Sequence, residues 1–130
     1  GIVPASMLTT PLSFETVLGS GAVVVFDESR DVIDFVHRTM QFLNEESCGK
    51  CTPCREGTEV MVEIYSRLVN GEGAADDIVQ LEELSEAMML SSLCGLGQAA
   101  PIPVLDTLKY YRNEYENRIK QSVFLRTLRI

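Results

Sequence analysis

The 130-residue chain lacks most of the features that mark common classes of enzyme and binding protein. Its single histidine, His37, lies among acidic residues, so no Ser–His–Asp set for hydrolysis can be assembled. No run of residues approaches the ~20 apolar positions of a membrane span, which argues against an integral membrane protein. Lys and Arg number 11 against 19 Asp and Glu, and the net charge of −8 argues against a nucleic-acid partner. No GxGxxG phosphate loop is present either, and residues 19–21 (GSG) predict a simple turn.

The length and composition predict one domain with a modest core, with 45% hydrophobic and 23% charged residues. Four cysteines in a secreted domain of this size would suggest two disulfides. Three of the four are separated by only two residues each, and such short loops strain a disulfide. We therefore expect a reducing compartment, either the cytoplasm or an organelle matrix.

The cysteines carry the strongest functional signal in the chain. Cys48, Cys51 and Cys54 form a C-x2-C-x2-C motif, and Cys94 follows after 39 intervening residues. Four thiols in this 3+1 arrangement suit a cubane [4Fe–4S] cluster, in which each iron takes one thiolate. A tetrahedral zinc site also uses four thiolates, but its ligands more often come as two C-x2-C pairs. The spacing favours iron over zinc and leaves zinc as the alternative.

The residues around the motif predict a loop that leads into a helix. Positions i, i+3 and i+6 of a regular helix rotate away from one face, so the three sulfurs converge only from a loop. Pro53 restricts Thr52 to extended geometry, and Gly49 permits positive φ or a close backbone approach. Lys50 and Arg55 either ease the negative charge of a reduced cluster or are ordinary surface cations.

Hydrophobic periodicity predicts a mainly α fold, a four-helix antiparallel bundle that holds the cluster. The first three expected helices begin at about Asp31 with Ser29 as N-cap, at Pro53 with Thr52 as N-cap and an end at Asn70, and near Asp76 or Asp77. A fourth helix is expected after Pro101 and Pro103 and continues to Ile119. The expected core residues are Ile33, Val36, Met40, Leu43, Val60, Ile64, Leu68, Ile78, Leu81, Leu84, Met88, Val104, Leu105, Leu108, Tyr111, Tyr115 and Ile119.

The apolar, β-branched run over residues 22–26 predicts one buried strand. A single strand has no independent stability, and no second strand is evident. We therefore expect this chain to be the C-terminal piece of a longer protein.

The motif extends over residues 46–57 (ESCGKCTPCREG), with CGLG at residues 94–97. This block resembles the flavin-bearing, NADH-oxidising subunit of respiratory complex I. It also resembles the related diaphorase subunits of NAD-reducing and bifurcating hydrogenases and of NAD-dependent formate dehydrogenases. The likeness runs from Pro4 to about Ile119. In that family a region that binds FMN and NADH precedes a small β-grasp (SLBB) domain and a helical [4Fe–4S] domain.

The resemblance implies the following organisation. Residues 1–30 correspond to the trailing end of the β-grasp domain and a connector, 31–120 to the helical [4Fe–4S] domain, and 121–130 to a tail. Cys48, Cys51, Cys54 and Cys94 take the four ligand positions, both as metal ligands and as cofactor-binding residues. The cluster relays single electrons from FMN to iron–sulfur centres of a partner subunit.

The resemblance also limits what we expect of this chain. The FMN and NADH region has no counterpart in it, so whether the chain is an enzyme is left open, and we do not expect it to oxidise NADH alone. The expected partners are a thioredoxin-like [2Fe–2S] subunit and an iron–sulfur relay subunit, in a complex that is membrane-associated or free. Two alternatives are a structural zinc domain with four cysteine ligands that organises assembly, and a cofactor-free bundle that serves as an assembly surface.

Overall fold

The computed structural model describes residues 1–13 and 23–128, and in this part of the chain every regular element is a helix. The elements are the 3-10 helix Ala5–Met7 (η1) and the α-helices Val32–Glu45 (α1), Thr52–Val69 (α2), Ala75–Ser91 (α3), Gly95–Ala99 (α4), Ile102–Tyr110 (α5) and Arg112–Leu128 (α6). The prediction of a mainly α fold is confirmed. None of the described helices is both long and apolar enough to cross a membrane.

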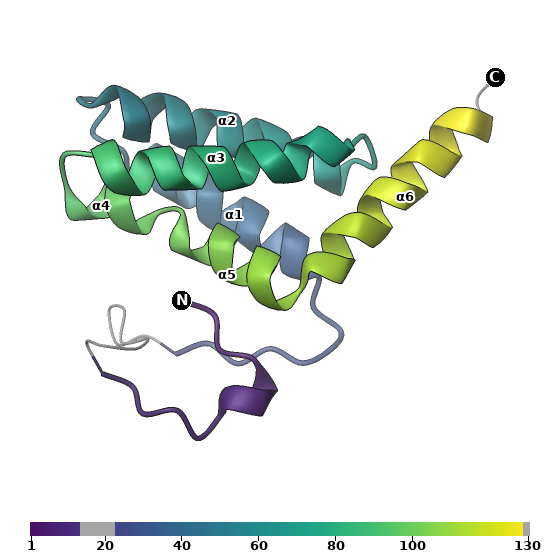
Figure 1. Cartoon of the computed structure of the whole chain (residues 1–130), viewed down its shortest axis with the longest axis horizontal. Coiled ribbons are helices and arrows are strands. Elements are labelled where there is room, and N and C mark those ends of the chain that lie inside the picture. The colour runs from purple at the N-terminus through teal and green to yellow at the C-terminus, as the bar shows by residue number, and fades with distance from the viewer. Residues whose placement is uncertain (14–22, 129–130) are drawn as a thin grey trace.

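Helices α1, α2 and α3 form the body of the fold. The helix α1 packs against α2, and α2 packs against α3 (Figure 1). A short turn over residues 70–74 joins α2 to α3, so the two helices run in opposite directions. As a result the loop before α2 and the loop after α3 lie at the same end of the molecule (Figure 1). That shared end is where the cysteines are found.

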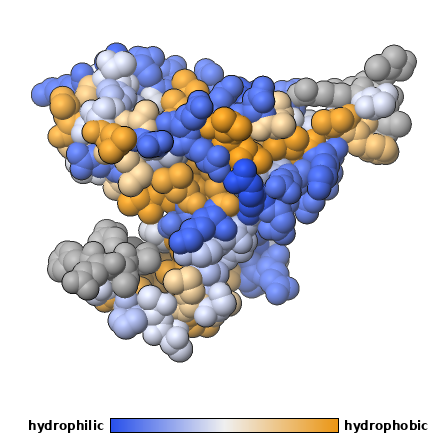
Figure 2. Space-filling view, in the orientation of Figure 1, coloured by the Kyte–Doolittle hydropathy of each residue, from blue (hydrophilic) through white to orange (hydrophobic). Residues whose placement is uncertain are grey.

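One hydrophobic core holds the helices together. Apolar side chains recur every three or four positions on each long helix, so one stripe of each faces inward. The largest apolar and aromatic residues that are less than 2% exposed are Tyr65, Tyr115, Ile33, Met40, Met61, Ile64, Leu68, Leu81, Met88, Val36 and Val104. Of the predicted core, Leu43, Val60, Leu84, Leu105 and Tyr111 are only half-buried. On the face shown in Figure 2, hydrophobic and hydrophilic residues are mixed on the surface of the helices.

The start of α1 differs from the prediction. Asp31, not Ser29, is the N-cap, because its Oδ1 accepts hydrogen bonds from the amides of Ile33 and Asp34 at 2.9 and 3.1 Å. The hydroxyl of Ser29 instead bonds Asp27 in the preceding turn. An aspartate at the cap satisfies two of the unpaired amides that begin every helix.

Helix α2 ends as predicted, but it begins one residue earlier, because Cys51 is its N-cap and Thr52, the expected cap, is its first residue. Pro53 lies in its first turn, where a missing N–H costs nothing. Asn70 is its C-cap, and Gly71 follows with φ +72°, a conformation that glycine adopts without strain.

The prediction of one long fourth helix is wrong, because the chain bends at Tyr111 (φ −132°, ψ 29°) and forms α5 and α6. The hydroxyls of Thr107 and Tyr115 lie 2.7 Å apart across this bend. In a continuous helix, positions eight residues apart would lie about 12 Å apart along the axis. The bend therefore makes the contact possible. Residues 121–128, expected as a tail, continue α6.

The predicted strand is also absent from the residues that the structure describes. Residues 23–26 have no regular structure, and Val23, Val24 and Val25 are exposed. A strand needs a hydrogen-bonded neighbour, and no described segment supplies one. The predicted turn at residues 19–21 lies outside the described residues. The first residues of the chain contact α5, because the amide of Ile2 donates a hydrogen bond to Asp106 Oδ2 at 2.7 Å.

Candidate metal centre

Two loops at the shared end of the bundle carry the four cysteines. Cys48 and Cys51 lie in the loop between α1 and α2, Cys54 lies in the first turn of α2, and Cys94 lies between α3 and α4. All four are free thiols. Cys54 is 4% exposed, Cys51 is half-buried, and Cys48 and Cys94 are exposed. The site thus has a closed inner side at Cys54 and an open rim.

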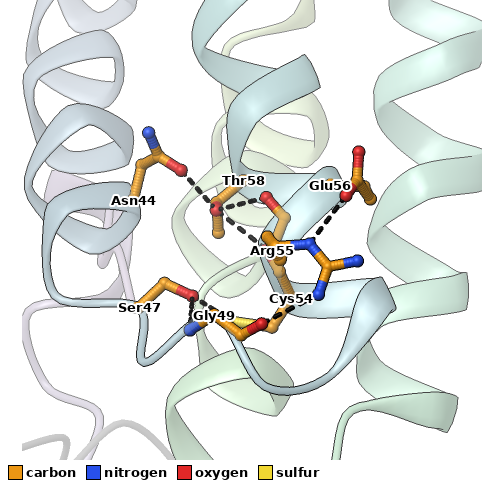
Figure 3. Close-up of polar contacts among 7 residues, drawn as sticks. All are labelled: Asn44, Ser47, Gly49, Cys54, Arg55, Glu56 and Thr58. Atoms are coloured by element: carbon orange, nitrogen blue, oxygen red, sulfur yellow. Dashed lines mark hydrogen bonds and ion pairs between the residues drawn. The ribbon is translucent and has the colours of Figure 1, made fainter.

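Local hydrogen bonds fix the course of the cysteine loop (Figure 3). Gly49 has φ +72°, and its amide donates to Ser47 Oγ at 3.3 Å. The guanidinium of Arg55 donates to the carbonyl of Gly49 at 2.8 Å and pairs with Glu56 at 2.7 Å. Arg55 therefore braces the loop from the helix, a role between the two alternatives that the sequence left open. Lys50 is exposed.

The loop is also anchored from behind. Thr58 Oγ1, one turn after Cys54, lies 2.8 Å from the carbonyl oxygen of Cys54 and 2.8 Å from Asn44 Oδ1 on α1 (Figure 3). On the loop side, Ser47 Oγ lies 3.4 Å from Cys54 Sγ. The end of α1 and the start of α2 are thereby joined around Cys54. No pattern in the sequence marks Thr58, Asn44 or Ser47, because only the fold brings them together.

Backbone amides face the thiol of Cys51. The amide of Leu93, hydrogen-bonded to the sulfur, lowers the pKa of Cys51 most, followed by the amide of Cys54 and the positive charge of Arg55. Leu93 immediately precedes Cys94, so this contact brings the second loop against the first. Cys51 is also the N-cap of α2, and the N-terminus of a helix favours negative charge. The environment stabilises a thiolate, the form that binds metals.

Gly97 allows the two loops to come close at the inner side of the site. A Cβ at Gly97 would lie 2.6 Å from both Cβ and Oγ of Ser92 and 2.9 Å from Cβ of Cys54. Real Cβ atoms essentially never come this near to other atoms. Ser92 is 5% exposed, and its hydroxyl has no hydrogen-bond partner among the described residues. Nothing in the sequence pattern marks Ser92 as part of the site.

The residues at this end of the bundle have the chemistry of a sulfur-bound metal group, although their side chains do not yet converge on one point. No three His, Cys, Asp or Glu side chains in the described parts of the chain converge closely enough to hold a metal ion as they stand. The loops nevertheless present soft thiol donors, amides directed at sulfur and a buried hydroxyl that lacks a partner. Thiolate donors select iron–sulfur clusters, zinc or copper(I). The residues present therefore fit a cysteine-bound cluster at this end of the bundle.

A helical fold with four cysteines at one end fits a domain that binds a metal group through sulfur, and comparison with known proteins gives the family. The family model described as "NADH-ubiquinone oxidoreductase-F iron-sulfur binding region" matches residues 34–118, more than half of the chain. The chain belongs to this family, which confirms the resemblance seen in the sequence. The family model is of a [4Fe–4S] region, so the cofactor prediction is confirmed as well.

Individual relatives agree with this assignment. An NADH-quinone oxidoreductase subunit of Mycobacterium tuberculosis is 43% identical over 114 residues, which are 83% of this chain and 26% of that protein. The NADP-reducing hydrogenase subunit HndC of Solidesulfovibrio fructosivorans is 40% identical over 105 residues, 81% of this chain and 21% of its own. The chain spans about a quarter of the length of the curated relatives it matches.

Solved structures give the same picture. The crystal structure of an NAD+-reducing [NiFe]-hydrogenase in the air-oxidised state matches with a TM-score of 0.83 and 37% sequence identity. The match covers 89% of this chain and 20% of the hydrogenase chain. The H2-reduced state of such a hydrogenase matches with a TM-score of 0.70 and 38% identity. The chain is thus an iron–sulfur module of the NADH-dehydrogenase type, and the zinc alternative is not favoured.

Proposed function

We propose that this chain is an electron-relay module in which Cys48, Cys51, Cys54 and Cys94 bind one [4Fe–4S] cluster. The observation that carries the proposal is the close approach of the two cysteine loops at Gly97, where an added Cβ would lie 2.6 Å from Ser92, near Cys94, and 2.9 Å from Cβ of Cys54. The helices α1, α2, α3 and α5 would serve as a four-helix bundle that holds these loops in place.

The chemistry of the module is transfer of single electrons. When bound, the cluster supplies a site that gains and loses one electron without making bonds to a substrate. The protein fixes the position of the site, and its amides, the helix N-terminus and Arg55 ease the added negative charge. The electrons would come from FMN reduced by NADH and would pass to iron–sulfur centres of a partner subunit, as the resemblance implies.

The rest of the proposal concerns the longer protein and its complex. Residues 1–30 would be the trailing end of a β-grasp domain, 31–120 the cluster domain and 121–130 a tail. FMN and NAD(H) would bind to a preceding region, and a thioredoxin-like [2Fe–2S] subunit and an iron–sulfur relay subunit would be the partners. In support, Leu90 and Leu93 beside Cys94 are 79% and 81% exposed, as expected of an apolar contact surface. The module would work in a reducing compartment, the cytoplasm or an organelle matrix, where closely spaced thiols stay available to bind a cluster.

The test is metal analysis of the chain purified without oxygen. We expect a brown protein with about four irons per chain and an EPR signal after reduction. A colourless protein with one tightly bound zinc would overturn the proposal. The assignment of the ligands is tested by Cys94→Ala, for which we expect loss of the four-iron cluster. A full cluster at native yield in this variant would exclude Cys94 as the fourth ligand.

A further inference from the structure

Ser92 is a buried polar residue that the proposed ligand set leaves unexplained. It is the C-cap of α3, where its amide donates to the carbonyl of Met88 at 3.0 Å. Its own carbonyl accepts a hydrogen bond from Gln98 Nε2 at 3.0 Å. Both backbone groups are satisfied, but the hydroxyl has no partner among the described residues and is closed off from solvent. A buried hydroxyl without a partner is unfavourable, so its presence calls for a reason.

Other buried serines show what is unusual about Ser92. Ser85, seven residues earlier on α3, donates its hydroxyl to the carbonyl of Leu81 at 2.5 Å. Ser122 on α6 donates in the same way to the carbonyl of Arg118 at 2.9 Å. This bond to the residue four positions earlier is the usual solution within a helix. Ser92 has left the helical conformation (φ −71°, ψ 142°), and its hydroxyl makes no such bond.

The position of the hydroxyl points to what it bonds. Ser92 Oγ lies against Gly97, and Cys54 Cβ lies against the same glycine. Cys54 is the most buried of the four cysteines, and its sulfur already has Ser47 Oγ at 3.4 Å on the α1 side. Ser92 therefore places a second hydroxyl on the α3 side of the same corner of the site.

We propose that the Ser92 hydroxyl donates a hydrogen bond to a sulfur at the Cys54 corner of the [4Fe–4S] cluster and so raises the reduction potential. The inference rests on the proposed function and adds a residue that tunes it. Hydrogen bonds to sulfur favour the reduced form, because they stabilise its additional negative charge. Reduction adds one electron and breaks no bond, and the proton stays on Ser92. Ser92 is thus a positioning and tuning residue rather than a ligand.

The test is an EPR-monitored redox titration of the anaerobically purified chain and its Ser92→Ala variant. We expect the variant to keep about four irons per chain. Its equilibrium constant for reduction should fall by about tenfold, which corresponds to about 59 mV for a one-electron couple. Ser85→Ala is the matched control, because it removes a buried hydroxyl of the same helix that already has a partner. We expect it to leave the potential unchanged.

A second measurement observes the hydrogen bond directly. In pulsed EPR of the reduced cluster after exchange into D2O, the wild type should show one exchangeable proton coupling that Ser92→Ala lacks. If Ser92→Ala fails to hold a cluster, Ser92→Thr, which keeps the hydroxyl, should restore both the cluster and the potential.

The outcomes separate this inference from the proposed function. A wild type without a four-iron cluster overturns both. A loaded wild type whose potential and proton couplings are unchanged in Ser92→Ala overturns the role of Ser92 alone. Failure of Ser92→Thr to restore a cluster that Ser92→Ala has lost also overturns it.

Discussion

The hydroxyl oxygens of Tyr65 on α2 and Tyr115 on α6 lie 2.7 Å apart, and both side chains are fully buried. The second hydroxyl also lies 2.7 Å from Thr107 Oγ1, so three hydroxyls form one chain in the core. Burial raises the pKa of both tyrosines, so they remain neutral hydrogen-bonding groups. These hydrogen-bonded hydroxyls link α2, which follows the cysteine loop, to α5 and α6.

This chain of hydroxyls predicts an order of stability among tyrosine variants. Tyr115→Phe leaves the Tyr65 hydroxyl buried without a partner and should cost about 1–3 kcal/mol. Tyr65→Phe leaves Tyr115 bonded to Thr107 and should cost only about 0.5–1.5 kcal/mol. The double variant should be less destabilised than the sum of the two, because it leaves no hydroxyl unpaired. Anaerobic urea unfolding, followed by circular dichroism, measures the stability of all three variants. If the losses of stability in the two single variants add up to that of the double variant, the three hydroxyls are not linked by hydrogen bonds.

The cap of α1 gives a second prediction. Asp31→Ala should destabilise the chain by about 1 kcal/mol, the usual value of an N-cap. Ser29→Ala, at the position that the sequence favoured, should have almost no effect and is the matched control. An equal effect of the two substitutions in urea unfolding would show that Asp31 is not the working cap.

The contribution of Asp31 should depend on pH. Partial burial alone would raise the pKa of Asp31, but the amide of Asp34, the nearby Arg118 and the amide of Ile33 together hold that pKa below its ordinary value. A carboxyl group with a lowered folded pKa adds stability above its unfolded pKa, about 3.9, and loses it as the pH falls through the folded value. The difference between wild type and Asp31→Ala should thus be complete at pH 7 and shrink below about pH 4.

Gly97 and Gly95 provide a matched pair next to Cys94. In Gly97→Ala the added Cβ would collide with Ser92 and Cys54, whereas at Gly95 nothing lies within 4 Å of the added atom. We expect Gly97→Ala to lose most of its iron and Gly95→Ala to keep about four irons per chain. Iron analysis after anaerobic purification measures both. Equal iron content in the two variants would contradict the close approach at Gly97.

The far end of the α2–α3 hairpin should affect stability without affecting the metal. Arg67 Nη2 lies 2.5 Å from Asp77 Oδ1, and the Asp77 side chain is 4% exposed. Arg67→Ala should cost about 1.5 kcal/mol, the lower end for bonds to charged groups, because water reaches the arginine. Arg38→Ala removes an exposed pair and should cost less than about 0.5 kcal/mol. Urea unfolding and iron analysis should show the loss of stability at unchanged iron content.

The sequence predicted those parts of the fold that have local signals. Pro53 and the Asn70-Gly71 pair mark both ends of α2, and the apolar spacing of α1 and α3 predicts their buried faces. The bend at Tyr111 has no proline or glycine to mark it, and the hydroxyl contact across it, between Thr107 and Tyr115, has no signal in the local sequence. The strand prediction over residues 22–26 failed for the described residues because β-branched content alone provides no partner strand.

The site divides in the same way. The sequence shows the spacing of the cysteines and the presence of Gly97 near Cys94. The hydroxyls of Thr58 and Ser92 gain their meaning only from burial and from neighbours on other helices. Serine is common on helices, and nothing in its spacing from Cys94 distinguishes Ser92 from Ser91, which is exposed.

Three of the four cysteines lie outside the buried core, and the fourth, Cys54, is buried but is not part of the main hydrophobic cluster. Cys48 and Cys94 lie at the exposed rim, where an oxidant arrives first, whereas the hydrophobic cluster that joins α1, α2 and α3 is built from other residues. Loss of the cofactor in air and unfolding of the chain are then separate events. We expect the chain to stay folded after it has lost its iron. Reassembly of the cluster then requires only iron, sulfide and reduced thiols.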